Sequence, residues 1–226
     1  MKDKHSGVAG VLLAAGSGSR LGRPKAFVHL GERTLVERGI STLAGAGCDP
    51  VVVVLGAAVP SGATSRLSSL PERPHVVVNP DWAEGISTSL RVGLAASAGS
   101  DAAVVALVDQ PGISTALIGR LVDRWRRGGS AAVVASYGGS PRNPVVLSAS
   151  VWPEVIASAS GDAGARSWLR ANPGRVVHVE CADLGGEGDI DTPDQLAAAE
   201  AAWSLRDESG QAPMSSNPRK EDDFDG

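Results

Sequence analysis

The chain has 226 residues, of which 42% are hydrophobic and 20% are charged. This is the composition of a globular protein, and the length allows one domain of about 200 residues with short tails. The formal net charge of −4 argues against a nucleic-acid partner, which needs a basic surface. No apolar run approaches the roughly 20 residues that a membrane-spanning helix requires, so we expect no membrane partner.

The first residues imitate a secretory signal, because two lysines precede an apolar run with small residues. That run is short, and Asp3 lies in its basic part. Cleavage after Ala15 would also remove the loop described below. We therefore expect a cytoplasmic protein.

Apolar runs of strand length alternate with segments of helical periodicity along the chain. The expected strands are residues 8–15, 51–55, 76–78, 102–108, 131–136, 144–147 and 176–181. The expected helices are residues 34–46, 60–70, 86–96, 115–127, 152–159, 163–171 and 192–205. This alternation predicts an α/β three-layer sandwich with a mostly parallel central sheet. We expect a polar tail over residues 1–6, a single domain over 7–206 and a disordered acidic tail over 207–226.

The loop that follows the first strand is rich in Gly and Ser. It spans residues 16–24, carries Arg20 and Arg23, and leads directly to Lys25. Free backbone N–H groups at the end of a buried strand, with cations nearby, form a site for a polyanion. The loop matches neither the Walker motif nor the dinucleotide fingerprint, in which Leu21 would have to be Gly. As a bare pattern it is equally typical of an ordinary turn.

Asp109 follows the third strong strand, in the sequence Asp-Gln-Pro. A carboxylate at the end of a hydrophobic strand is costly unless it is solvated, paired or bound to a metal. Ligands of parallel α/β sheets lie beyond the carboxyl ends of the strands. Asp109 is therefore a candidate Mg²⁺ ligand, although an Asp before Gln-Pro also initiates turns.

Asp189 and Asp191 precede the last expected helix. Asp191 or Thr192 suits the N-cap of that helix, which is a common role of Asp, with Pro193 in the first turn. Asp189 has no such structural explanation. Two carboxylates one residue apart can help to hold a divalent ion that Asp109 also contacts.

Five strings of residues give the chain a family resemblance. The string from Leu13 to Lys25, LAAGSGSRLGRPK, resembles the signature of the MobA-like nucleotidyltransferases, which include the molybdenum cofactor cytidylyltransferases. The other strings are Asp109-Gln110-Pro111, the run from Asn79 to Leu94, the GDAGAR of residues 161–166 and the DIDTP of residues 189–193. The resemblance covers about residues 8–203. It implies the Rossmann-like nucleotide-diphospho-sugar transferase fold.

The resemblance also implies which residues bind the donor. Arg20, Lys25 and Asp109 would be catalytic, and Asp109, Asp189 and Asp191 would hold Mg²⁺. Asn79 would reach the base or the ribose, although a simple Asn-Pro turn explains its spacing nearly as well. The implied nucleotide-binding residues are Leu13, Ala14, Ala15, Gly16, Ser17, Gly18, Lys25, Asn79, Gly85 and Ser89.

On the acceptor side the resemblance points to Asn143, Asp162 and Arg166. Arg166 suits bidentate contact with a pterin phosphate. The alternative is a loop and helix start with Arg166 on a solvated face. The family usually has G-x-P where this chain has Arg142-Asn143-Pro144, so the chain departs from the pattern there.

The implied activity is transfer of CMP from CTP to the phosphate of molybdenum-loaded molybdopterin, with release of pyrophosphate. The cytidylyl branch tends to read LAAG and the guanylyl branch LAGG, and an Ala15 methyl group would narrow the pocket against a purine. The expected partners are CTP or another NTP, a molybdopterin-type acceptor, and a molybdoenzyme or its chaperone. Two alternatives stay open: a guanylyl- or cytidylyltransferase with another phosphorylated acceptor, and a non-catalytic protein that binds and delivers the cofactor.

Overall fold

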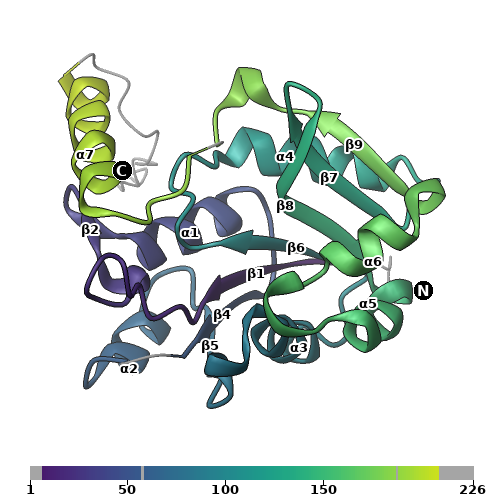
Figure 1. Ribbon diagram of the computed structural model, residues 1–226, viewed down its shortest axis with the longest axis horizontal. Coiled ribbons are helices and arrows are strands. Elements are labelled where there is room, and N and C mark those ends of the chain that lie inside the picture. Colours follow the sequence, from purple (N-terminus) through teal and green to yellow (C-terminus); the bar gives the residue numbers. More distant parts are fainter. Residues whose placement is uncertain (1–6, 57–58, 187, 209–226) are drawn as a thin grey trace, which may run out of the picture.

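The computed structural model describes residues 7–56, 59–186 and 188–208, with side chains up to Trp203 (Figure 1). Its centre is a seven-stranded sheet in the order β5-β4-β1-β6-β8-β7-β9. β8 is antiparallel to both of its neighbours, and the other strand pairs are parallel. The strands are β1 (Val8–Ala14), β4 (Val51–Leu55), β5 (His75–Val78), β6 (Ala102–Leu107), β7 (Ala132–Tyr137), β8 (Ser140–Ser148) and β9 (Val176–Glu180).

Helices cover both faces of this sheet. The helices are α1 (Leu35–Gly45), α2 (Ala63–Ser68), α3 (Ile86–Ala96), α4 (Thr115–Arg126), α5 (Trp152–Ser158), α6 (Arg166–Ala171) and α7 (Pro193–Glu208). One apolar core lies between the sheet and α1 and α4, and the other lies between the sheet and α3, α5 and α6. The expected three-layer α/β sandwich with a mostly parallel sheet is thus confirmed.

β1 shows why the sequence produces two cores. Every residue of the strand is buried, so both of its faces are covered. Leu12 and Ala14 belong to the core under α1, whereas Val11 and Leu13 belong to the core under α3. Side chains alternate between faces along a strand, so a continuous apolar run fills both layers.

Short elements complete the chain. A two-stranded hairpin, β2 (His29–Leu30) and β3 (Arg33–Thr34), leads into α1, whose N-cap Thr34 forms a capping box with Glu37. α7 packs beside β2 at the edge of the molecule (Figure 1). The 3-10 helices are η1 (Lys25–Phe27), η2 (Trp82–Glu84), η3 (Ala149–Val151), η4 (Gly161–Ala163), η5 (Pro173–Arg175) and η6 (Ala182–Leu184).

Several elements begin or end a few residues from the expected positions, such as α2, and three differences have a clear consequence. Residues 140–143, expected in a turn, form the start of β8, because only Gly138 and Gly139 are needed to reverse the chain. Residues 163–165 precede α6 instead of opening it, since Gly164 has a φ of +53°. α7 continues to Glu208, past the expected end of the domain. Residues 1–6 and 209–226, expected to be tails, lie outside the described residues.

No helix within the described ranges is both long and apolar enough to cross a membrane.

Candidate functional site

The Gly-rich loop and Asp109 meet because β1 and β6 are parallel neighbours. Leu13 of β1 is paired with Leu107 of β6, and the Val108 N–H donates to the Leu13 carbonyl oxygen at 3.1 Å. The two strands therefore end at the same edge of the sheet. Residues 15–24 leave β1 at the point where Asp109 follows β6.

Gly16 and Gly18 of this loop differ in what a side chain at their position would contact. Gly18 has a φ of +62°, and a Cβ there would lie 2.0 Å from the Arg23 carbonyl oxygen. The turn at Gly18 brings the chain back toward the sheet, so that Lys25 reaches the strand ends. A Cβ at Gly16 would meet no atom within 4 Å. Glycine at position 16 therefore leaves open space beside the loop.

The loop also leaves its backbone donors free. The N–H groups of residues 16–20 donate to no other residue that the structure describes. Groups of this kind bind phosphate oxygens in other proteins. The loop therefore has the donors that a polyanion needs.

Lys25 lies between two carboxylates from distant parts of the chain. Its Nζ atom is 2.6 Å from Asp109 Oδ2, and it also donates a hydrogen bond to Asp191 Oδ1. All three side chains are largely buried. Burial alone would lower the pKa of the Lys25 ammonium, but the hydrogen bonds to Asp109 and Asp191 outweigh it and raise that pKa. Lys25 is therefore a fixed cation at neutral pH.

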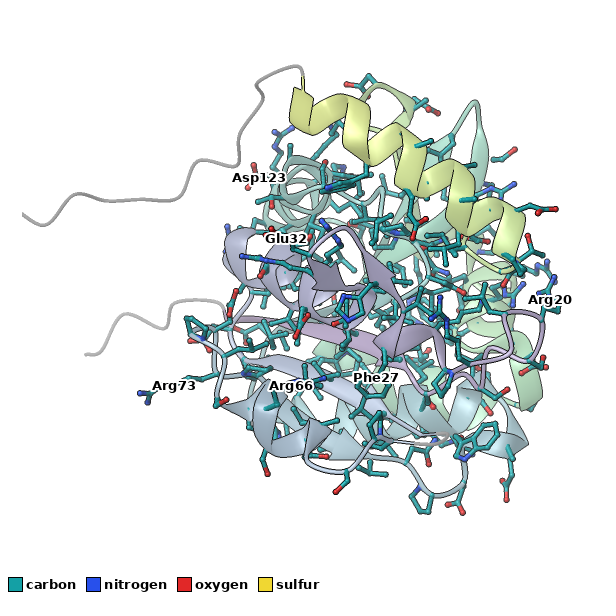
Figure 2. The ribbon with its side chains drawn as sticks, turned by 90° about the vertical axis from the view of Figure 1, so that its left-hand side faces the viewer. Arg20, Phe27, Glu32, Arg66, Arg73 and Asp123 are labelled. Carbon is teal, nitrogen blue, oxygen red and sulfur yellow. The ribbon has the colours of Figure 1, made fainter. Side chains whose placement is uncertain are left out.

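Asp191 receives a second cation. Arg20 Nη2 lies 3.0 Å from Asp191 Oδ2. The hydrogen bond from Lys25, opposed by burial and aided by the charge of Arg20, lowers the pKa of the Asp191 carboxyl. Figure 2 shows Arg20 at the surface, close to the end of α7 where that helix begins. Because its side chain is 69% exposed, Arg20 contributes little to this cluster.

Asp191 does not cap α7. Gln195 Oε1 accepts the backbone N–H groups of Asp191 and Thr192 at 2.8 and 3.0 Å, and Thr192 Oγ1 accepts the Gln195 N–H. Thr192 and Gln195 thus form a capping box, so the second of the two N-cap candidates, Thr192, caps the helix. The Asp191 carboxylate is left free to face Lys25.

Asp109 keeps one oxygen without a partner. Its Oδ1 atom is buried and accepts no hydrogen bond from any described residue, and the same holds for Oε1 of the adjacent Gln110. Buried polar atoms in native proteins are almost always paired, so unpaired ones call for an explanation. The unpaired carboxylate oxygen beside a Gly-rich loop fits a site that receives a cation.

Asp189 lies beside this cluster instead of within it. Its Oδ1 accepts a 2.7 Å hydrogen bond from Gln110 Nε2, while the Ile190 N–H donates to the Asp109 carbonyl oxygen at 2.8 Å. No group of three His, Cys, Asp or Glu side chains among the described residues is close enough to hold a metal ion. The predicted set of three carboxylates therefore does not converge. Asp109 and Asp191 both contact Lys25, whereas Asp189 accepts a hydrogen bond from Gln110.

A pocket of about 310 Å³ opens next to Lys25 and Asp109. Ligand pockets of small molecules have volumes of this order. Of the predicted nucleotide-binding residues it contains Leu13, Ala15, Gly16, Ser17, Lys25, Gly85 and Ser89. Ala14 and Gly18 belong to the same strand end and loop but do not line it. Trp82 of η2, which the sequence analysis left unassigned, forms part of the wall.

The Asn79 side chain is buried and hydrogen-bonded within the protein. It is 1% exposed, and its Nδ2 atom donates to Thr88 Oγ1 at 2.8 Å and to Ser89 Oγ at 3.0 Å. Its Oδ1 accepts the Asp81 N–H. With these bonds Asn79 joins the turn after β5 to the start of α3. It holds Ser89 in place, and the predicted direct contact with base or ribose is not available to it.

The predicted acceptor residues are divided between two places. Asp162 lines the same pocket as Lys25, next to Gly85, where a Cβ would lie 2.9 Å from Asp162 Oδ1. Arg166 donates to the Asp162 carbonyl oxygen at 2.8 Å. Asn143 belongs to β8, and its carbonyl oxygen accepts from Tyr137. Asp162 and Arg166 therefore lie on the side of the Gly-rich loop.

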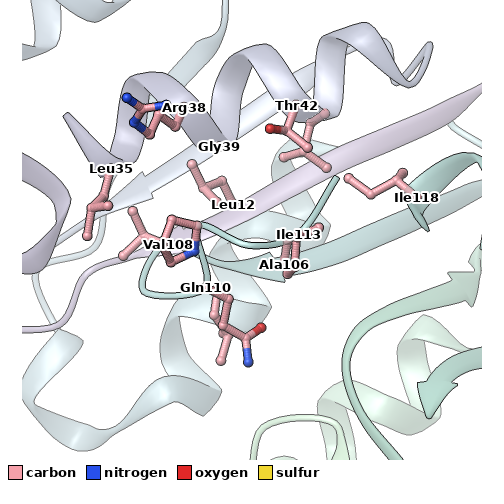
Figure 3. A pocket seen from close by; sticks show the side chains of 13 residues that line it. Leu12, Leu35, Arg38, Gly39, Thr42, Ala106, Val108, Gln110, Ile113 and Ile118 are labelled. Atoms are coloured by element: carbon pink, nitrogen blue, oxygen red, sulfur yellow. The ribbon is translucent and has the colours of Figure 1, made fainter. Parts of the chain in front are cut away.

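A second, much smaller cavity lies under α1. It measures about 20 Å³, is lined by apolar side chains such as Leu12, Leu35 and Ile118, and has Gln110 at its rim (Figure 3). Figure 3 shows the Gln110 amide turned away from these apolar side chains. The cavity is about the size of one water molecule and has no room for a substrate.

Residues 10–177 match the protein-family model described as the MobA-like NTP transferase domain. The chain belongs to this family. The match spans the Gly-rich loop, Lys25 and Asp109, whereas Asp189 and Asp191 lie beyond its end. It also supports an enzyme of the transferase class and confirms the resemblance drawn from the sequence motifs.

This MobA-like chain is similar to proteins of different names. It is 43% identical over 195 residues to a protein of Paenarthrobacter nicotinovorans named nicotine blue oxidoreductase, over 84% of this chain and 94% of that protein. It is 33% identical over 143 residues to a probable molybdenum cofactor guanylyltransferase of Opitutus terrae, over 62% and 67% of the two chains. The names of relatives therefore do not fix a substrate.

A solved structure gives the same fold. The crystal structure of Rv0371C from Mycobacterium tuberculosis H37Rv, in complex with manganese, superposes with a TM-score of 0.68 at 25% identity. The superposition covers 87% of this chain and 99% of that one.

Proposed function

We propose that the protein is a metal-dependent nucleotidyltransferase that moves CMP from CTP to the phosphate of molybdenum-loaded molybdopterin. The observation that carries the proposal is the position of Lys25. Its ammonium lies between the carboxylates of Asp109 and Asp191, beside a pocket that opens at Gly16. Membership of the MobA-like family and the molybdenum cofactor guanylyltransferase among its relatives support the same class of reaction.

The residues at this point fit a divalent cation. Asp109 offers a buried, unpaired carboxylate oxygen, and Asp191 offers a carboxylate that caps no helix. Mg²⁺ is commonly bound by one or two carboxylates, with phosphate oxygens and water as its other ligands. When bound, the ion would offset the repulsion between the two anionic substrates. Asp189, held by Gln110, would act beside these two ligands, and the manganese complex of the M. tuberculosis relative is consistent with a divalent ion.

The reaction joins two phosphates. An oxygen of the acceptor phosphate forms a bond to the α-phosphorus of CTP, the bond from that phosphorus to the bridging oxygen breaks, and pyrophosphate leaves with the electron pair. The acceptor phosphate is already ionised at pH 7, so no general base is required. The barrier lies in charge repulsion and alignment.

The chain supplies groups for both tasks. The free N–H groups of residues 16–20 and the cations of Lys25 and Arg20 would hold the triphosphate. Lys25 is largely buried and fixed by two carboxylates, so its charge is preorganised. Arg20 is exposed, so its guanidinium would be able to leave Asp191 and contact the β- and γ-phosphates.

The preference for cytosine rests on the wall of the pocket. Ala15 and Trp82 both pack against Gly56. A Cβ at Gly56 would lie 2.6 Å from Trp82 Cβ and 2.7 Å from Ala15 Cβ, so only glycine allows these two side chains to come so close to the backbone there. The Ala15 methyl group and the Trp82 ring thus limit the pocket on one side. We infer that this space favours a pyrimidine over a purine.

Two other functions remain candidates. An oxidoreductase is favoured by the 43% identity to the nicotine blue oxidoreductase. A delivery protein would bind a pterin without releasing pyrophosphate, and its partner would be a molybdoenzyme or the chaperone of one. Against the oxidoreductase, the loop lacks the third glycine of the dinucleotide fingerprint, where Leu21 stands.

One experiment separates these functions. The purified protein is incubated with CTP or GTP, Mg²⁺ or Mn²⁺ and molybdenum-loaded molybdopterin, and pyrophosphate release is followed. We expect release with CTP, dependent on the metal ion and on the acceptor. A preference for GTP would overturn the base assignment. Oxidation of a reduced nicotinamide nucleotide, without pyrophosphate, would support the oxidoreductase, and pterin binding without either reaction would support the delivery protein.

A further inference from the structure

A further pocket, distinct from the small cavity under α1, lies on the other side of the Lys25 cluster from the pocket that opens at Gly16. It measures about 700 Å³ and forms an open groove between α7 and the body of the domain. No residue lines both this pocket and the one that opens at Gly16. The two are joined through the ion pair between Lys25, which lines the first pocket, and Asp191, which lines the second. The reactive cluster therefore has one compartment on each side.

The second pocket carries an available cation. Arg142 of β8 lines it, is exposed, and forms no ion pair with any side chain that the structure describes. Asp189 and Asp191 line the same pocket. An unpaired guanidinium suits a phosphate, which it can contact through two N–H groups. The two carboxylates would repel that phosphate unless the divalent ion proposed above is bound beside them. Arg166, by contrast, lies with Asp162 on the Gly16 side.

The remaining wall is largely apolar. Leu30, Ile190 and Trp203 line it together with Ala198 and Ala202 of α7. The small alanine side chains leave the space between helix and body open. Pockets with an apolar wall and a few polar groups are typical of sites for organic ligands.

Trp203 fixes the position of α7. The Arg38 guanidinium lies 3.8 Å from the centre of the Trp203 ring and donates to the Leu30 carbonyl oxygen. Gly31 lies directly against this pair, since a Cβ there would be 3.3 Å from Arg38 Nη2 and in ordinary contact with Trp203 Cδ1 at 3.6 Å. Figure 1 shows α7 beside β2, apart from the central sheet. Two contacts therefore hold α7, the wall of the pocket, against the domain: the cation–π contact between Arg38 and Trp203, and the burial of the Leu196 side chain.

We propose that this pocket between α7 and the domain body binds the acceptor, a phosphomonoester of a planar ring compound, and that Arg142 binds its phosphate. The proposal rests on the nucleotidyltransferase function above. It moves the acceptor phosphate contact from Arg166 to Arg142 and makes Ala202 a residue that determines the size of the acceptor.

The test uses binding as well as turnover. A pterin phosphomonoester is titrated into the full-length protein, and its fluorescence anisotropy gives the affinity. Ala202→Trp fills the pocket, and Ala201→Trp is its matched control, because Ala201 is exposed on the same helix and does not line the pocket. We expect Ala202→Trp, by filling the pocket, and Arg142→Ala each to weaken binding at least about tenfold; for Arg142→Ala this corresponds to the loss of one hydrogen bond between charged groups. Ala201→Trp and Arg166→Ala should change it less than about twofold, and CTP binding should be unaffected in all four.

The outcomes separate the two proposals. Weaker pterin binding in Arg166→Ala than in Arg142→Ala, unchanged binding in Ala202→Trp, or no binding by the unaltered protein would each overturn the acceptor site. If the unaltered protein releases pyrophosphate while Ala202→Trp keeps the same KM for the acceptor, the transferase function stands and the acceptor site fails. If the expected binding changes occur without pyrophosphate release, the acceptor site stands and the transferase function fails.

Discussion

The Lys25 ammonium lies 2.6 Å from the Asp109 carboxylate, although 84 residues separate them in the chain. Lys25 stands in η1, directly after the loop that leaves β1, and Asp109 stands directly after β6. Their contact follows from the parallel pairing of β1 and β6 and from the turn at Gly18. The proposed reaction depends on this contact more than on any single motif.

Replacing Asp109 by Asn tests the cation site. The two side chains have the same shape, so the fold and the melting temperature should change little. Loss of the charge should reduce pyrophosphate release roughly 10²–10³-fold, as for other preorganised electrostatic groups. The control is Asp123→Asn on α4, whose side chain is 64% exposed. Turnover that stays within a factor of two in Asp109→Asn would remove Asp109 from the reaction.

Asp191 and Asp189 should differ as metal ligands. Asp191 faces Lys25 together with Asp109, whereas Asp189 is bonded to Gln110. We expect Asp191→Asn to weaken Mn²⁺ binding, measured by electron paramagnetic resonance, by about tenfold or more, and Asp189→Asn to weaken it less. The expected factor follows from the loss of the charged oxygen ligand at Asp191. Loss of the charge at Asp189, which does not contact the ion directly, should cost less binding free energy. The reverse order would show that Asp189 is the second ligand and that Lys25 occupies Asp191 in the working enzyme.

The two glycines of the loop should separate stability from binding. In Gly18→Ala the new Cβ would be 2.0 Å from the Arg23 carbonyl oxygen, at a φ of +62°. This should lower the free energy of unfolding by about 1–3 kcal/mol, measured by urea denaturation. In Gly16→Ala the Cβ meets nothing, so stability should be unchanged while the KM for CTP rises. Equal effects of both substitutions on stability would contradict this assignment.

The ion pair of Lys25 and Asp191 predicts a pH dependence of stability. The folded protein lowers the pKa of Asp191 from its ordinary value of 3.8. The pair therefore contributes stability above about pH 4, and this contribution is lost as the pH falls through the lower, folded-state pKa. It is also lost at high pH, as the pH rises through the raised pKa of Lys25, above 10.5.

A double-mutant cycle of Lys25→Ala and Asp191→Asn measures this contribution. The coupling free energy, obtained from urea denaturation, should be constant between about pH 5 and pH 9 and should vanish in acid. The cycle of Arg126→Ala and Asp123→Asn serves as control, since that exposed pair is 3.9 Å apart and should show almost no coupling at any pH. A coupling energy for Lys25 and Asp191 that is equally small would mean that the pair is solvated.

The sequence by itself determined the layers of the fold and the position of the reactive loop. Apolar runs such as Val51–Leu55 and the helical period of Ile86–Ala96 match the observed elements residue for residue. These patterns are local, because a strand buried on both faces must be apolar throughout and a helix must repeat every 3.6 residues. The Gly-rich loop and Asp109 were found in the same way, since each comes at the end of an apolar strand, and Lys25 comes directly after that loop.

Only the tertiary structure decided which of the candidate residues meet. Asp189 and Asp191 look alike in the sequence, yet Gln110 engages the first and Lys25 the second. Asn79 matched a nucleotide-binding string but is buried against Thr88 and Ser89. The pocket beside Arg142 and Trp203 arises where α7 returns to β2, and its lining comes from segments as distant in the chain as Leu30 and Trp203. Local patterns fix what each segment becomes, but a site depends on distances between segments, and only packing sets those.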